Sequence, residues 1–135
     1  MAAIEVDDSR WPLIVIHWPA GAIEDADVDA FLRVSLAHLA RNERFASLHD
    51  GVRASGLDSR GRKRMSDHVN ANRPSLKRWH VAAAIVSSSA MVRGIVTAVN
   101  WVSPPPFPQK QFAVRAEAET WLRTMLDADR ASSTP

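Results

Sequence analysis

The polar side chains best placed to hold a ligand follow two apolar runs, FASLH (residues 45–49) and VAAAIV (residues 81–86). Such runs are typical of strands in a parallel sheet, whose carboxyl ends meet at the edge where open α/β sheets bind ligands. Hydroxyl groups, free amides at a helix start and arginine side chains suit an anion. The sequence therefore predicts a ligand or anion site at this edge. Its candidate residues are Asp50, Arg53, Ser55, Ser87, Ser88, Ser89 and Arg93.

Simpler roles for the same residues stay open. A serine after a strand can cap the next helix by accepting a hydrogen bond from a first-turn amide. The segment from Gly51 to Gly56 can be a flexible connection between a strand and a helix. Its two glycines are spaced as in a phosphate-binding P-loop, but Leu57 and Asp58 stand where that motif needs lysine and serine or threonine, which excludes it.

Metal binding and hydrolysis find no support in the sequence. The chain has no cysteine, and its five histidines lack a metal-ligand spacing such as HExxH. His49-Asp50 with Ser55 could suggest a hydrolase, but there is no GxSxG motif, and adjacent residues do not form a base with its orienting carboxylate. We therefore predict no enzyme activity, no metal and no cofactor, and structural roles for the histidines. These are His17, His38, His49, His68 and His80.

An apolar helix that runs into a proline-rich turn is a candidate contact surface. Residues 90–102 (AMVRGIVTAVNWV) are apolar around most of the helix circumference, so we expect burial on more than one side. Any part that stays exposed would mark a protein interface or the mouth of a pocket, and packing on the sheet and a neighbouring helix is the alternative. The candidate interaction residues are Val99, Trp101, Val102, Pro105 and Phe107.

The elements that must position these residues alternate between strand and helix (β-β-α-β-α-β-α-β-α). An initial hairpin followed by this alternation predicts an α/β fold with one mixed, mostly parallel five-stranded sheet flanked by four helices. The first strand should be an antiparallel edge. The expected strands lie near residues 4–6, 11–18, 45–49, 81–86 and 110–114. The first helix should be capped by Asp25, the second by Asp58 or Ser59 and the third, which begins near Ala90, by the preceding serines, and the last helix should begin at Ala116.

The composition predicts a single globular domain over residues 1–130, followed by a frayed tail over residues 131–135. Hydrophobic residues make up 46% of the 135, which is ordinary for a globular protein. No apolar run approaches the roughly 20 residues that cross a bilayer. The N-terminal residues lack the pattern of a signal peptide, and the absence of cysteine suits a reducing compartment, so we expect a cytoplasmic protein.

Charge is distributed unevenly along the chain, although the net charge is only +2. Acidic residues dominate between Glu5 and Asp29, and basic residues dominate between Arg60 and Arg78. Such asymmetry can steer a charged partner, or it can reflect two solvated faces. The basic cluster has no aromatic platform or helix-turn-helix pattern beside it, so we do not expect nucleic acid as a partner.

Four motifs resemble the bacterial SpoIIAA-like (STAS-like, STAS/SEC14-type) proteins of unknown function. They are WPLIVIHWP (11–19), FASLHD (45–50), LKRWHVAAAIVSSSAMVRGIVTAVNWVSPPPFPQKQF (76–112) and AEAETWL (116–122). The resemblance implies a small α/β domain with a mixed central sheet. It also implies a non-catalytic role, either as a regulatory protein–protein switch or in binding a small apolar or lipid ligand.

Two departures limit what this resemblance implies. Anti-sigma-factor antagonists of the STAS type carry a phosphorylatable serine in an Asp-Ser-Ser-Gly-like motif, whereas Ser55 follows Arg53-Ala54 and has no second serine beside it. The SEC14 lipid-transfer domains are considerably longer than this chain. Both departures argue against carrying over a phospho-switch or a fully enclosed lipid cavity.

From these observations we expect a non-enzymatic regulatory or protein–protein interaction module. It should associate with itself, as a possible homodimer, through the apolar surface of the helix over residues 90–102. The alternative is a binder of a small apolar or lipid-like ligand between helix 90–102 and the sheet, and an anionic ligand is a further possibility at the serine-containing edge.

Overall fold

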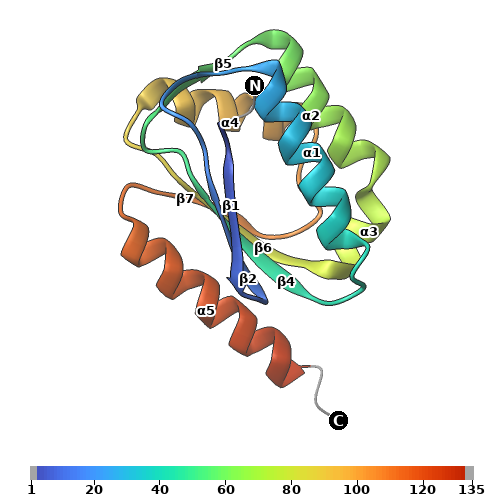
Figure 1. The fold of residues 1–135 in the computed structure, drawn as a ribbon. Coiled ribbons are helices and arrows are strands. Elements are labelled where there is room, and N and C mark those ends of the chain that lie inside the picture. Colours follow the sequence, from blue (N-terminus) through green and yellow to red (C-terminus); the bar gives the residue numbers. More distant parts are fainter. Residues whose placement is uncertain (1–2, 133–135) are drawn as a thin grey trace.

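The computed structural model describes residues 3–132, which are built around a five-stranded sheet (Figure 1). The strand order is β1-β2-β4-β6-β7. β1 pairs antiparallel with β2, and the other neighbours are parallel. The predicted sheet and its antiparallel edge are therefore confirmed. The strands are β1 (Glu5–Arg10), β2 (Leu13–His17), β4 (Phe45–Asp50), β6 (His80–Val86) and β7 (Gln109–Phe112).

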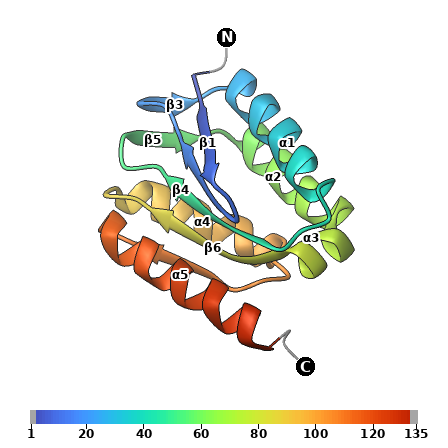
Figure 2. The same cartoon turned by 60° about the horizontal axis from the view of Figure 1, so that its bottom comes forward.

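Helices cover both faces of this sheet, but very unequally. Figures 1 and 2 show α5 alone on one side of the sheet, with the other helices on the opposite side. Strand β2 shows why both faces of the sheet need cover, because its first four residues are all buried and their side chains point alternately to the two faces. Leu13 and Val15 pack in the cluster that includes Leu122 of α5, and Ile14 and Ile16 pack in the opposite cluster. The helices are α1 (Asp25–Leu39), α2 (Ser59–Ala71), α3 (Arg73–Trp79), α4 (Ala90–Val102) and α5 (Arg115–Ser132).

The number of helices and the role of two connections differ from the expectation. The chain has five helices in its described part rather than four, because Pro74 lies in the first turn of a separate short helix, α3, after α2 has ended. The connections after β2 and β4 each contain a short strand, β3 (Gly21–Ile23) and β5 (Ala54–Leu57), which pair in parallel as a second small sheet. Strands this short carry no clear hydrophobic alternation.

The predicted helix caps are confirmed at two of three helices. The Asp58 carboxylate accepts a hydrogen bond from the Gly61 amide at 2.8 Å, and the Ser89 hydroxyl accepts one from the Val92 amide at 3.3 Å. Asp25 is not the cap of α1. Glu24 holds that position, and its amide donates to the carboxylate of Asp27, which is only 3% exposed.

The expectation that helix 90–102 is buried on more than one side is wrong. No residue of α4 is buried, and the exposed fractions of Met91, Trp101 and Val102 are 68%, 85% and 76%. The physical reason is that α4 packs against α2 and β5, at the rim of the sheet, instead of lying flat on the sheet. One apolar side of the helix therefore faces inward and another faces outward.

The predicted C-terminal tail over residues 131–135 is described only as far as Ser132. Ala131 and Ser132 are the last residues of α5, whereas the rest of the predicted tail lies outside the described residues. No helix in the described part of the chain is long and apolar enough to cross a bilayer.

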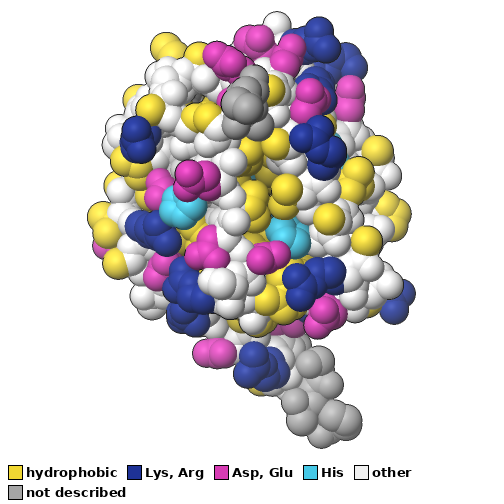
Figure 3. Space-filling model, viewed as in Figure 1, with side chains coloured by type: hydrophobic (Ala, Val, Ile, Leu, Met, Phe, Trp, Pro, Cys, Tyr) yellow, Lys and Arg dark blue, Asp and Glu magenta, His cyan; other side chains and the backbone are white. Residues whose placement is uncertain are grey.

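Two ion contacts join the acidic and basic stretches of the sequence where α1 packs beside α2. Arg64 forms an ion pair with Asp29, and the nearest N–O approach between Arg60 and Asp25 is 3.7 Å. Figure 3 shows acidic and basic side chains interleaved on the upper part of that view, over these helices. Part of the acidic stretch therefore lies against part of the basic stretch.

Candidate ligand-binding cavity

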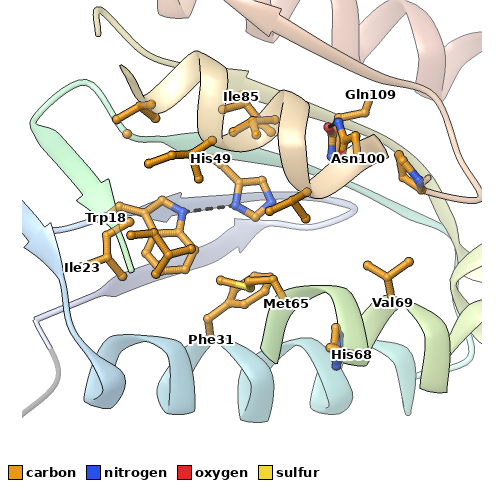
Figure 4. Close-up of a pocket in the computed structure, with 18 of the residues that line it drawn as sticks. Trp18, Ile23, Phe31, His49, Met65, His68, Val69, Ile85, Asn100 and Gln109 are labelled. Atoms are coloured by element: carbon orange, nitrogen blue, oxygen red, sulfur yellow. Dashed lines mark hydrogen bonds between the residues drawn. The ribbon is translucent and has the colours of Figure 1, made fainter. Parts of the chain in front are cut away.

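A cavity of about 200 Å³ lies between α4 and the sheet. In Figure 4, side chains from α1 and α2, including Phe31 and Met65, lie opposite α4 and the strands. Pro105 and Phe107, from the segment after α4, also line the cavity. Most of the lining is apolar. Its larger aliphatic members are Ile23, Leu57, Met65, Val69, Leu76, Ile85, Val92, Ile95, Val96 and Val99.

Two features of the sequence create this space. Ala83 of β6 contributes only a methyl group to the wall, where a longer aliphatic side chain would fill the gap. The inward face of α4 consists mainly of β-branched residues, and the helix sits away from the sheet against β5 and α2. The result is an apolar volume that neither the strands nor the helix fills.

The lining contains no Lys, Arg, Asp or Glu among the residues that the structure describes. Its polar side chains are Trp18, Ser35, His49, His68, His80, Asn100 and Gln109. A charged ligand would therefore lose its hydration without gaining a partner of opposite charge, which is strongly unfavourable in an apolar site. The cavity is suited to an uncharged molecule.

Hydrogen bonds connect four side chains in the wall and directly behind it. The Trp18 indole N–H donates to Nδ1 of His49 at 3.2 Å (Figure 4). The Ser47 hydroxyl lies 3.4 Å from Nε2 of His49 and 2.8 Å from Nε2 of His80. Ser47 and His49 share one face of β4 because side chains two residues apart in a strand point the same way.

Aromatic rings hold His80 in place. Its ring centroid lies 4.7 Å from that of Phe45 and 4.0 Å from that of Phe107. The exposed fraction of His80 is 9%. This ring, held at the wall of the cavity, has little freedom to turn.

Burial keeps the two central histidines neutral. It lowers the pKa of His49 to about 4, and it lowers the pKa of His80 to about 3 with a smaller contribution from the neighbouring His49. Burial also lowers the pKa of His68, whose Nε2 lies 2.9 Å from the Ser35 hydroxyl. At neutral pH these rings carry no positive charge.

The predicted anion-site loops do come together at the carboxyl edge of the sheet. The Ser88 hydroxyl donates to the Val52 carbonyl at 3.2 Å and so joins the two loops. The hydroxyls of Ser87 and Ser89 are engaged locally, with the Ser89 backbone and with the first turn of α4. These contacts favour the capping role that the sequence left open.

The charged members of the predicted anion site lie apart from the cavity. Asp50 pairs with Arg115 at 3.4 Å and lies 3.7 Å from His17. Arg53, Ser55 and Arg93 are exposed, and none of the predicted anion-site residues lines the cavity. Anion binding at this edge stays a prediction.

The predicted interaction residues separate into two groups. Val99, Pro105 and Phe107 are half-buried and line the cavity, whereas Trp101 and Val102 are among the most exposed large apolar side chains. Three of the five candidate residues therefore lie at a pocket, and the other two lie on an exposed apolar surface.

Sequence reasoning missed the polar network around the cavity. Trp18, Ser47, His49 and His80 come from three strands or their ends, and no local spacing connects them. A usable signal was present in FASLHD, where Ser47 and His49 place two polar groups on the same face of an otherwise buried strand.

The described residues offer no arrangement for metal or triad chemistry. They contain no group of three His, Cys, Asp or Glu side chains that could hold a metal ion. The Ser47–His80 pair resembles a nucleophile with a base, but His80 contacts aromatic rings where a triad needs an orienting carboxylate.

Solved structures share this architecture over most of their length. An uncharacterized protein of the DUF3478 family from Shewanella loihica PV-4, described as having a SpoIIAA-like fold, matches with a TM-score of 0.63 and 17% identity over 89% of this chain and 92% of its own. The fold is SpoIIAA-like. The predicted resemblance is thereby confirmed at the level of fold.

Two further structures agree. The anti-sigma factor antagonist SpoIIAA in its unphosphorylated form matches with a TM-score of 0.64 and 16% identity, over 90% of this chain and 97% of its own. An anti-sigma factor antagonist from Mycobacterium paratuberculosis matches with a TM-score of 0.54 and 16% identity, over 91% and 99%. No protein-family model and no curated protein matches the sequence.

Proposed function

We propose that this SpoIIAA-like chain is a non-enzymatic binding module that holds a small apolar molecule under α4. The observation that supports the proposal best is the apolar, charge-free cavity between α4 and the sheet. A cavity of this kind destabilises a protein, because the lining atoms lack partners for dispersion contacts. A ligand that fills it would restore those contacts and remove its own apolar surface from water.

The position of α4 gives such a molecule a route of entry. The helix has no fully buried residue, and its contacts are mainly with α2 and β5. The wall formed by the sheet comes from β4 and β6, each of which is hydrogen-bonded to a neighbouring strand on both sides. We infer that α4 moves outward to admit the ligand.

Filling the cavity from α4 should abolish binding. Val96→Phe places a ring in the space that a ligand would occupy, and we expect at least a tenfold loss of affinity for apolar probes such as acetophenone. The matched control is Thr97→Phe, one residue along the same helix but on its exposed side. Titrations followed by amide NMR shifts would measure both. Equal binding by the two variants would contradict a site under α4.

Self-association through the outer side of α4 is a second candidate function, with another copy of this chain as the partner. It is favoured by the exposed ends of α4, where Trp101 and Val102 present apolar surface to solvent. Two of the similar structures are anti-sigma factor antagonists, which supports a regulatory role exerted through protein contacts.

A charge at the exposed end of α4 should dissociate any such dimer. We expect Trp101→Asp to raise the dimer dissociation constant at least tenfold, since the carboxylate would have to be desolvated in the interface. Thr120→Asp on the exposed side of α5 is the control. Sedimentation velocity would decide, and a wild-type protein that stays monomeric at high concentration would rule out self-association.

A further inference from the structure

Asn100 and Gln109 place two primary amides in the otherwise apolar wall of the cavity. Asn100 lies one helical turn after Val96 on the inward side of α4, where an apolar side chain would continue the lining. Gln109 is the first residue of β7 and pairs with Ala83, so its side chain lies on the face of the sheet where Ala83 leaves the gap. Figure 4 shows the two side chains meeting at the end of the lining away from Trp18.

One hydrogen bond joins this amide pair, as we call Asn100 and Gln109, and leaves both a donor and an acceptor unused. The side-chain N–H of Asn100 donates to the side-chain oxygen of Gln109. No group in the described residues forms a hydrogen bond with the side-chain oxygen of Asn100 or with the NH₂ group of Gln109. Exchanging oxygen and nitrogen in both amides reverses the bond and again leaves one free oxygen and one free NH₂ group, on the opposite residues.

The free oxygen and the free NH₂ group of the amide pair remain accessible. Both residues are half-buried, and the buried side-chain atoms that lack a partner in the described part of the chain belong to His38, His80 and Gln111. The unpaired atoms of Asn100 and Gln109 are therefore not enclosed by the packing, and they belong to residues that line the cavity. A molecule in the cavity can reach them.

The other polar side chains of the lining are more fully engaged with their neighbours. The single N–H of Trp18 donates to His49, and both ring nitrogens of His49 have contacts, one with Trp18 and the other with Ser47. Both ring nitrogens of His68 also lie within hydrogen-bond distance of polar side chains. The amide pair is thus the place in the lining where an accessible donor and an accessible acceptor lie together.

We propose that the amide pair binds the polar group of the ligand, and that this ligand is an uncharged molecule with an apolar body and a group that both donates and accepts a hydrogen bond, such as an alcohol or an amide. This inference rests on the proposed function and specifies its ligand class. The polar group donates to the free oxygen of the amide pair and accepts from the free NH₂ group. The apolar body lies against the aliphatic lining.

Other classes of ligand leave part of the amide pair without a partner. A hydrocarbon satisfies neither free group, and a ketone or an ether accepts from the NH₂ group but offers nothing to the oxygen. A carboxylate has the same deficiency and brings a charge that no lysine or arginine among the described lining residues compensates. Covering a polar group without pairing it costs free energy, so the amide pair selects a ligand that has both functions.

The first experiment compares 1-phenylethanol with cumene, in which a methyl group replaces the hydroxyl at nearly constant shape. The Asn100→Leu/Gln109→Met variant removes both amides together, so that neither is left without its partner. We expect the ratio of the two affinities to fall about tenfold from wild type to this variant, the effect of two hydrogen bonds. Titrations followed by the backbone amide NMR shifts of α4 and β6 measure each affinity.

Gln111→Met is the matched control. Gln111 lies two residues further along β7 on the same face and contacts Thr97 of α4, but it does not line the cavity. Its substitution removes a contact between α4 and β7 and leaves the amide pair in place, so the affinity ratio should stay within about twofold of wild type. If the amide pair served only to join α4 to β7, the double variant would show the same small change.

The second experiment observes the amide pair directly in the wild-type protein. Proton–nitrogen NMR spectra show the side-chain NH₂ groups of asparagine and glutamine, and a proton that enters a hydrogen bond moves downfield. We expect 1-phenylethanol to move a side-chain proton of Asn100 or Gln109 downfield, and cumene to cause no such shift. Binding of the alcohol under α4 without this shift would overturn the inference. The experiment needs no variant, so it decides the question even where the double variant fails to fold.

The possible failures are distinguishable. If both probes bind wild type and the affinity ratio is the same in the double variant, recognition by the amide pair is refuted and the apolar binding site stands. If neither probe shifts the backbone amide signals of α4 and β6, the proposed site itself fails, and the inference fails with it. Heat denaturation of each variant establishes that it is folded before it is compared.

Discussion

Replacing Leu122 with alanine should lower the free energy of unfolding by about 3 kcal/mol. Leu122 is fully buried in a cluster that includes Leu48 and Val86, and it belongs to the one helix that the described residues place on this face of the sheet. No neighbouring helix can move in to fill the space that the smaller side chain leaves. Urea denaturation at constant m-value would measure the loss.

The neighbouring position supplies the control for this substitution. Arg123→Ala lies on the exposed side of the same helix and should change stability by less than about 0.5 kcal/mol. A Leu122→Ala variant that loses under about 1 kcal/mol would mean that α5 is not the closing layer of that core.

Acidification from about pH 7 to about pH 5 should lower the free energy of unfolding by about 3 kcal/mol. Burial lowers the folded-state pKa of His49 to about 4 and that of His80 to about 3, whereas a histidine in the unfolded chain titrates near pH 6.5. Below that value the unfolded chain binds protons that the folded protein does not. The unfolded state is therefore increasingly stabilised as the pH falls, until the pH reaches the folded-state pKa values of the two histidines.

The measurement is a set of urea unfolding curves across this range, which lies above the region where carboxylates titrate. Removing one histidine together with its hydrogen-bond partner, in Ser47→Ala/His80→Phe, should reduce the pH dependence to about half. Burial also lowers the pKa of His38 and His68, so part of the slope persists in this variant. A wild-type stability that does not change across this range would contradict neutral, buried rings.

Local sequence patterns were enough to predict the sheet. The apolar runs over residues 45–49 and 81–86 became adjacent parallel strands, because a fully buried strand needs apolar side chains on both faces. Helix starts at Asp58 and Ser89 followed from capping chemistry that operates over three residues. These features depend on near neighbours in the chain, which a sequence shows directly.

The cavity could not be predicted in the same way, because it depends on how far α4 stands from the sheet. The apolar composition of residues 90–102 fits a buried helix and a helix that closes a pocket equally well. The histidine network joins residues from β4, from β6 and from the end of β2, so its geometry exists only after the sheet has formed. The strands β3 and β5 were missed for a simpler reason, since three or four residues show no period.

The space under α4 also sets how the protein responds to hydrostatic pressure. Unfolding eliminates internal voids, so the ligand-free protein should occupy less volume when unfolded than when folded. High pressure should therefore favour its unfolding. A molecule seated in the void would remove part of that volume difference. Pressure denaturation of freshly purified protein, before and after extraction with organic solvent and refolding, would thus report whether the chain carries an occupant, without any knowledge of what that occupant is.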